Sequence, residues 1–89
     1  YIWGDNSPYH ADANFVAKEL FGGEMSGNVP GGRVVGLRTE GKTAGIAPSH
    51  LISTGLENVY EGVTIATVQP NRELAPVLYG SAGNLVVAA

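Results

Sequence analysis

The stretch DANFVAKELFGG, residues 12–23, decides the fold class. Asp12 is a residue type that caps helix N-termini, because its carboxylate accepts hydrogen bonds from free backbone N–H groups. Gly22-Gly23 supplies the left-handed conformation with which many helices end. We therefore predict one helix over about residues 13–21, too short to be stable unless it packs on something. Its apolar side chains recur at the spacing of a single helix face: Ala13, Val16, Ala17, Leu20 and Phe21.

Short β-strands are predicted on either side of this helix. The strongest candidate is Asn58–Val68, a run in which neither face is fully polar. Residues 76–79 and 84–88 flank Gly80–Gly83 and predict a β-hairpin. Residues 24–32 are rich in glycine and predict a loop. Further short strands are expected at residues 1–3, 33–38, 45–47 and 50–54.

These elements predict an α+β domain. The economical arrangement is one short helix packed against or wrapped by a twisted, mainly antiparallel sheet of about five to seven short strands. A chain of 89 residues makes a single small domain, so we assign residues 1–89 to one unit. Because the chain begins with Tyr1 rather than Met, we expect a processed protein or an excised domain.

The composition excludes several classes of function. The absence of cysteine excludes disulfides, zinc–thiolate sites and thiol nucleophiles. The net charge is −3, and five Lys and Arg residues scattered along the chain make no basic face, so nucleic acid is not an expected partner. No apolar run is long enough for a membrane span. We predict no cofactor and no metal.

Polar residues with catalytic potential are few and poorly spaced. His10 and Asp12, with Asp5 upstream, resemble an acid–base or metal cluster, but residues two apart in an extended segment point the same way by geometry alone. Ser49-His50 lacks a glycine-flanked nucleophile turn. The acidic pair Glu57 and Glu61 is interpreted as solvated. We therefore expect no enzymatic activity.

Aromatic side chains give one candidate binding site. Trp3, Tyr9 and Tyr60 could stack on sugar rings if they are exposed, with His10 and Asp12 as polar neighbours. The competing interpretation places these rings in a half-buried core.

The C-terminal segment gives a second candidate site. The chain is apolar to its last residue, and charged residues make up only 15% of it, against about 25% in typical soluble domains. Leu85, Val86 and Val87 could form an edge strand that pairs with another subunit. Alternatively, the segment completes the sheet of its own domain.

The N-terminal two thirds of the chain resembles the LCCL domain. That family opens with an aromatic-Gly pair, a Tyr, an acidic helix cap and a helix ending in Gly, followed by a Gly-Gly that leads into a valine-rich strand. The matching residues here are Trp3-Gly4, Tyr9, Asp12, Gly23, Gly31-Gly32 and Val34-Val35. Further along, Gly41, Ser53 and Tyr60-Glu61-Gly62 fall where the family tends to have a Gly, a Ser and an aromatic-x-Gly. The family's disulfide cysteines and its Ala-Ala-x-His-Ala-Gly helix end are absent.

Two functional hypotheses follow from these features. The LCCL resemblance implies an α+β extracellular module that binds polysaccharide or lipopolysaccharide through Trp3, Tyr9 and their neighbours. The low charge and the apolar C-terminus favour instead a structural subunit of a homo-oligomer, such as a phage capsid decoration protein, a filament protomer or a surface-layer protomer. Both hypotheses place the protein outside the cell or on a cell or virion surface.

Overall fold

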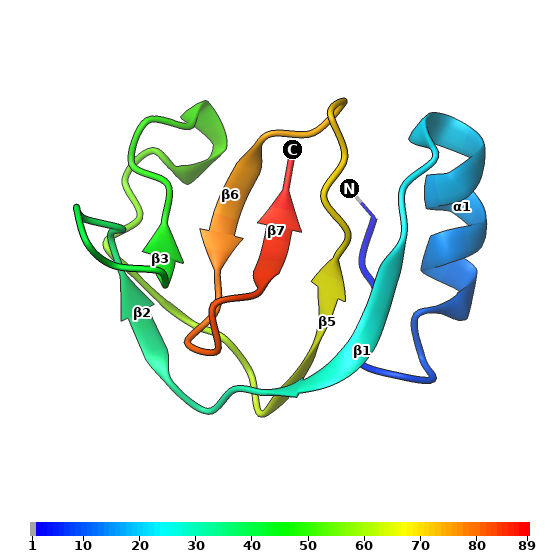
Figure 1. Cartoon of the computed structure of the whole chain (residues 1–89), viewed down its shortest axis with the longest axis horizontal. Helices are drawn as coiled ribbons and strands as arrows, with labels where there is room; N and C mark the ends of the chain where they lie inside the picture. Colours follow the sequence, from blue (N-terminus) through cyan, green and yellow to red (C-terminus); the bar gives the residue numbers. More distant parts are fainter. Residues whose placement is uncertain (1) are drawn as a thin grey trace.

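The computed structural model describes residues 2–89 and confirms the α+β class (Figure 1). The helix and the strands are all short, and every ladder between strands is antiparallel. The elements are α1 (Ala11–Phe21), β1 (Met25–Pro30), β2 (Val34–Gly36), β3 (Gly45–Ile46), the 3₁₀ turn η1 (Leu51–Ser53), β4 (Asn58–Tyr60), β5 (Thr64–Val68), β6 (Pro76–Tyr79) and β7 (Leu85–Ala88).

A bent two-stranded ribbon forms the frame of the molecule. β1 continues into β2, and together they run antiparallel to β4 and β5, with Val29 opposite Ile65 and Val35 opposite Val59. In Figure 1 this ribbon curves around the hairpin of β6 and β7. The predicted strand at residues 58–68 is therefore present, but it is divided in two at the bend.

Glycines at the bend allow the two strands of the ribbon to approach closely. Gly31 donates a backbone hydrogen bond to Val63, and a Cβ at Gly31 would overlap the carbonyl oxygen of Gly62. Gly62 has a φ of 91°, a conformation that L side chains rarely adopt. The ribbon thus turns where its sequence lacks side chains.

The hairpin of β6 and β7 confirms the prediction made from residues 76–79 and 84–88. β6 pairs with β7 on one edge and with β3 on the other. β7 belongs to this sheet, and its other edge lies beside β5, which belongs to the ribbon (Figure 1). The C-terminal segment therefore completes the sheet of its own domain.

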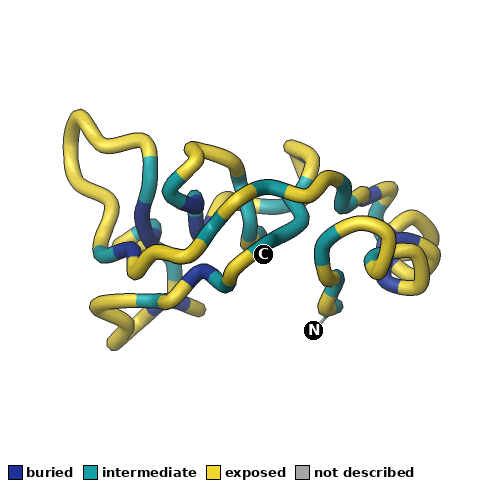
Figure 2. The backbone as a smooth tube through the Cα atoms, turned by 90° about the horizontal axis from the view of Figure 1, so that it is seen from below, coloured by how far each residue is buried: buried dark blue, intermediate teal, exposed yellow. Residues whose placement is uncertain are grey.

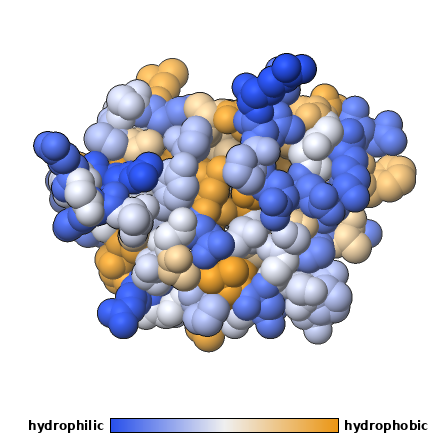
Figure 3. Space-filling model, viewed as in Figure 1, coloured by the Kyte–Doolittle hydropathy of each residue, from blue (hydrophilic) through white to orange (hydrophobic). Residues whose placement is uncertain are grey.

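The closed core is small and lies on the β2–β3–β6 side of the molecule. Its centre is Ile46, which is 1% exposed and packs with Val35 and Leu78. Ala44, Val59 and Val86 pack around this cluster. Buried backbone is confined to short stretches (Figure 2), and hydrophobic side chains show in the hollowed middle of the face in Figure 3.

Helix α1 lies at one end of the molecule beside β1, so the sheets do not wrap it (Figure 1). Asn14 fastens it there: its Nδ2 donates to the Met25 carbonyl at 2.7 Å, and its Oδ1 accepts from the Met25 N–H at 2.6 Å. Ala13 and Ala17 are buried beside Asn14. Large apolar side chains of the helix remain exposed, namely Phe15, Val16 and Leu20.

The prediction that Asp12 caps this helix is wrong. The helix begins at Ala11, because the Asn14 N–H already donates to the His10 carbonyl at 2.9 Å. His10 therefore occupies the capping position, without a side-chain hydrogen bond, and Asp12 lies in the first turn. The predicted end is confirmed, since Gly22 adopts the left-handed conformation with a φ of 67°.

Three further predictions of local structure are wrong. Residues 24–32 contain strand β1 rather than only a loop, because pairing with β5 outweighs their low strand propensity. Residues 50–54 contain the 3₁₀ turn η1, started by the His50 Nδ1 accepting from the Ile52 N–H at 3.2 Å. Residues 2 and 3 form no strand, and the rest of that prediction, Tyr1, lies outside the described residues.

Candidate functional site

A groove of about 650 Å³ is lined mainly by apolar side chains. The N-terminal segment forms one wall, β4 and β5 contribute a second, and β7 contributes a third. We call it the apolar groove, and its principal residues are Ile2, Trp3, Tyr60, Ile65, Val86 and Val87. The segments that form it lie far apart in sequence, so only the folded chain brings these side chains together.

Large apolar side chains at the apolar groove are exposed to solvent. Trp3 is 87% exposed and Tyr60 is 57% exposed, while Val87 is 40% exposed. An exposed tryptophan above an apolar groove is costly in water, since each Å² of apolar surface removed from water contributes about 25 cal/mol. Contiguous apolar surface of this kind marks interaction sites in soluble proteins.

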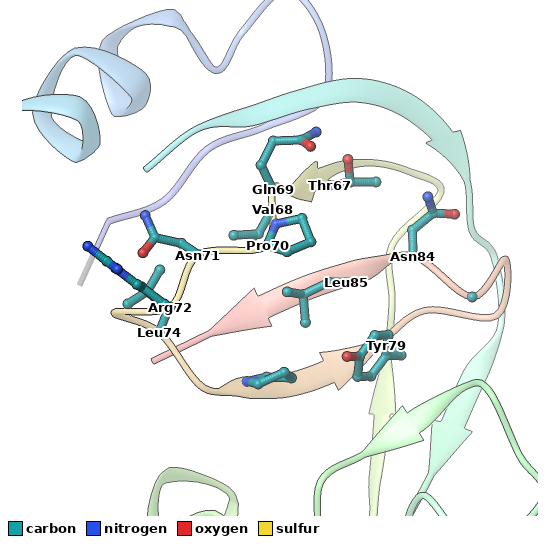
Figure 4. Close-up of a pocket in the computed structure, with 12 residues that line it drawn as sticks. Thr67, Val68, Gln69, Pro70, Asn71, Arg72, Leu74, Tyr79, Asn84 and Leu85 are labelled. Carbon is teal, nitrogen blue, oxygen red and sulfur yellow. The ribbon is translucent and has the colours of Figure 1, made fainter. Parts of the chain in front are cut away.

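A second groove of about 610 Å³ lies beside β7 (Figure 4). Its side chains come from the segment after β5, from β6 and from the β6–β7 turn. Leu85 lies in its middle, with Pro70 and Tyr79 on either side (Figure 4). Leu85 lines this second groove, whereas Val86 and Val87 line the apolar groove. The register between β6 and β7 shifts between these residues, so simple alternation along the strand does not hold here.

The side-chain amides of Gln69 and Asn71 in this second groove donate hydrogen bonds to other segments of the protein. Gln69 Nε2 donates to the Ser26 hydroxyl at 2.8 Å. Asn71 Nδ2 donates to the Phe21 carbonyl at 3.0 Å, which ties the loop to the end of the helix. Because these groups are already engaged, the second groove offers a ligand fewer polar contacts than its composition implies.

A buried carboxylate stands at the bend of the ribbon. Glu61 is 8% exposed. Its Oε1 accepts from the Arg33 N–H at 3.1 Å, and its Oε2 accepts from the Ser81 N–H at 2.7 Å. The Ser81 hydroxyl also donates to Oε1. Glu61 therefore joins the ribbon to the β6–β7 turn, and the interpretation of Glu57 and Glu61 as a solvated pair is wrong for Glu61.

The surroundings of Glu61 favour its ionised form. Burial raises the pKa of this carboxyl, but the hydrogen bonds from Ser81 and Arg33 and the nearby Arg33 charge outweigh it. The pKa of Glu61 consequently lies below its ordinary value of 4.5. A carboxylate whose oxygens are all engaged in this way acts as a structural tie between segments.

The structure brings together some of the predicted site residues and separates others. Trp3 and Tyr60 line the apolar groove, and so do Val86 and Val87 from the C-terminal segment. Leu85 lines the second groove. The other predicted binding residues, Tyr9, His10 and Asp12, lie at the start of α1 and line neither groove. Residues from two separate predictions, the aromatic binding site and the C-terminal edge strand, therefore line the same groove.

Acidic and histidine side chains form no metal-binding group in the described chain. Within residues 2–89, no three His, Asp or Glu side chains lie close enough to hold an ion. No helix in the same range has the length and apolar character needed to cross a membrane.

Sequence reasoning missed the residues that hold the grooves in place. Asn14 and Glu61 are buried polar residues, and their partners are backbone groups distant in sequence. One sequence signal was available for Glu61, since Gly62 beside it predicts a bend.

No family model matches the chain, and no curated protein or solved structure shows significant similarity to it.

Proposed function

We propose that this chain is a non-enzymatic interaction subunit that associates with another polypeptide through the apolar groove. The observation that carries this proposal is the exposure of Trp3, Tyr60 and Val87 around one groove of about 650 Å³. Tryptophan and tyrosine are the residues that most often dominate the binding energy of protein interfaces. The proposal places the protein in an extracellular or surface assembly.

The charges around the apolar groove support a polypeptide partner over an anionic one. Among the described residues, no lysine or arginine lines the groove, whereas Asp5 and Glu61 do. The net charge of −3 adds a further repulsion toward phosphates. A lipopolysaccharide carries anionic groups that would find no counter-charge here, whereas an apolar protein surface needs none.

The route of association follows from the position of β7. Its backbone pairs with β6, and its other edge, which carries no ladder of hydrogen bonds, lies beside β5, where a partner strand would have to pair. Val87 nevertheless lines the apolar groove. Association therefore uses side chains on a sheet face, in place of the strand pairing that the apolar C-terminus suggests.

Site-specific photocrosslinking tests the proposal. A benzophenone amino acid replaces Val87 in the apolar groove, and a matched variant carries it at Tyr9, which is 73% exposed and outside the groove. Irradiation in the cells that produce the protein is expected to give a covalent product with a polypeptide at position 87 and none at position 9. Equal yields at both positions, or no product at 87, would contradict the proposal.

The LCCL resemblance supports a second candidate, a saccharide-binding module. The specific observation in its favour is that Trp3 and Tyr60 line the same groove as Asp5 and Asn6. Exposed rings beside polar groups are the usual platform for sugars. Tyr9, His10 and Asp12 lie elsewhere, so a saccharide site here would use only part of the predicted set.

A glycan array separates the two candidates. The saccharide hypothesis predicts binding that is lost in Trp3→Ala and Tyr60→Ala and kept in Tyr9→Ala. If all three variants bind glycans as the unsubstituted chain does, the site is not at the groove. If the chain binds no glycan, the interaction subunit remains.

A further inference from the structure

The face of α1 that lies opposite its buried residues is both apolar and acidic. It carries Phe15, which is 73% exposed, and Val16, which is 44% exposed, together with the exposed acidic residues Asp12 and Glu19. These four residues follow one another at helical spacings of three and four, so they share one face of the helix. We call this face the acidic stripe.

Glu19 in the acidic stripe has no cationic partner within the described chain. Among residues 2–89 the side chains form two ion pairs, Lys18–Glu24 at 3.6 Å and Arg72–Glu73 at 3.9 Å. Glu19 also lies in the last turn of α1, where the partial negative charge of the helix end disfavours an anion. A cation supplied by another molecule would therefore stabilise Glu19.

The loop between β2 and β3, residues 37–43, carries two cations on a surface that is exposed along its whole length. Arg38 Nε donates to the Lys42 carbonyl at 3.3 Å, which ties the two ends of the loop together. The Arg38 guanidinium lies over the Tyr79 ring, 4.2 Å from its centroid, and anchors the loop to β6. With Glu40 included, this loop has a net charge of +1. We call it the cationic loop.

The charges of the chain are separated along its longest axis. Residues 5–24 hold four acidic residues and one lysine, a net charge of −3, whereas residues 33–57 hold three cations and two acidic residues, a net charge of +1. Figure 1 shows α1 and the loop between β2 and β3 at opposite ends of the molecule, which extends 33 Å along that axis. The two surfaces of one copy therefore cannot meet, and each is open to another molecule.

We propose that copies of this chain associate head to tail, with the acidic stripe of one copy against the cationic loop of the next. Glu19 then lies beside Lys42, and Phe15 packs on Leu37, which is 44% exposed, so charge and apolar contact are both complementary. Neither surface lines the apolar groove, so this inference goes beyond the proposed function. A contact between two different surfaces does not close at two copies and builds a ring or a filament.

An exchange of charges between the two surfaces tests this inference by sedimentation velocity of the purified chain. From about 1 μM to 1 mM, the unsubstituted chain should form species larger than a dimer, and about 0.5 M salt should weaken their association about tenfold. Glu19→Lys and Lys42→Glu, each alone, should associate at least about tenfold more weakly, because each variant brings like charges together. An equimolar mixture of the two should recover association, since every contact then joins opposite charges.

The controls and the outcomes keep this inference separate from the proposed function. Glu73→Lys, a charge reversal outside both surfaces, and Val87→Asp, in the apolar groove, should associate as the unsubstituted chain does, and circular dichroism should show that all variants are folded. A mass of 9.2 kDa at every concentration overturns the inference, and so does a mixture that associates no better than its components. Association that Val87→Asp abolishes and Glu19→Lys leaves intact also overturns it, and would support the apolar groove alone.

Discussion

The two sides of the ribbon differ in how completely they bury their apolar side chains. On the β2–β3–β6 side, Val35, Ile46 and Leu78 form a closed cluster that neighbouring side chains cover. On the side of β5, β7 and the N-terminal segment, Trp3 and Val87 line a groove that stays open to solvent. Leu78 and Val86 belong to both sides, but the most exposed apolar side chains at the groove, Trp3 and Tyr60, lie outside the closed cluster. Substitutions should separate these two sides.

Ile46 should give the largest loss of stability. Its side chain is 1% exposed at the centre of the closed cluster, so Ile46→Ala leaves a cavity and should cost about 2–5 kcal/mol of the free energy of unfolding. Chemical denaturation measures this loss. Leu51→Ala is the matched control, because Leu51 is 86% exposed and its loss should change stability little. Equal losses at the two positions would contradict the assignment of the core.

Glu61 should give the next largest effect, and one that depends on pH. Glu61→Gln replaces a carboxylate that accepts three hydrogen bonds, and should cost about 1–3 kcal/mol at neutral pH. Because the pKa of Glu61 is lowered by folding, its contribution is complete above the ordinary value of 4.5 and is lost as the pH falls through the lower folded value.

The pH profile provides the check on this prediction. The unfolding free energy of the unsubstituted chain should fall as the pH drops below 4.5, and Glu61→Gln should lack that part of the fall. Glu57→Gln serves as the control, because Glu57 is exposed. If the stability of Glu61→Gln falls with acid in the same way as that of the unsubstituted chain, the hydrogen bonds from Arg33 and Ser81 to the Glu61 carboxylate do not form.

Asn14 should have a smaller and more local effect. Asn14→Ala removes both hydrogen bonds to Met25 and should cost about 1–2 kcal/mol. The loss should loosen α1 from β1 and leave the closed cluster in place. Hydrogen exchange would then be faster in α1 and unchanged at the amide of Ile46. Faster exchange over the whole chain would mean that the helix is part of the folding core.

Trp3 should have the smallest effect on stability and a large one on association. Trp3→Ala removes a side chain that is 87% exposed, so the unfolding free energy of the monomer should change by less than about 0.5 kcal/mol. Denaturation at low protein concentration measures that quantity. A loss as large as that of Ile46→Ala would make Trp3 a core residue and contradict the division into two sides.

The sequence predicted the elements that local patterns determine. The left-handed end at Gly22 and the hairpin around Gly80–Gly83 follow from turn chemistry, and the structure has both. It did not predict strand β1, whose residues Gly27 and Pro30 disfavour strands and pair only because β5 lies alongside. It also placed Val16 and Leu20 on a buried helix face, whereas Asn14 is buried and both apolar residues are exposed.

The sequence indicates the residue types of the candidate site, but it does not indicate that these residues come together in one groove. The presence of aromatic rings and the apolar character of the C-terminal segment are visible in the sequence, whereas the exposure of those rings is not. That Trp3, Tyr60 and Val87 line one groove depends on the bend at Gly62 and on the position of β7 beside β5. Those contacts are long-range, so no local pattern encodes them.

The fluorescence of Trp3 tests the central claim most directly, because Trp3 is the single tryptophan of the chain and lies at the apolar groove. For the chain alone at low concentration, we predict emission at the wavelength of a solvent-exposed tryptophan and ready quenching by acrylamide, because Trp3 is 87% exposed. Emission at shorter wavelengths that acrylamide does not quench would contradict the account, because Trp3 would then lie in a closed core.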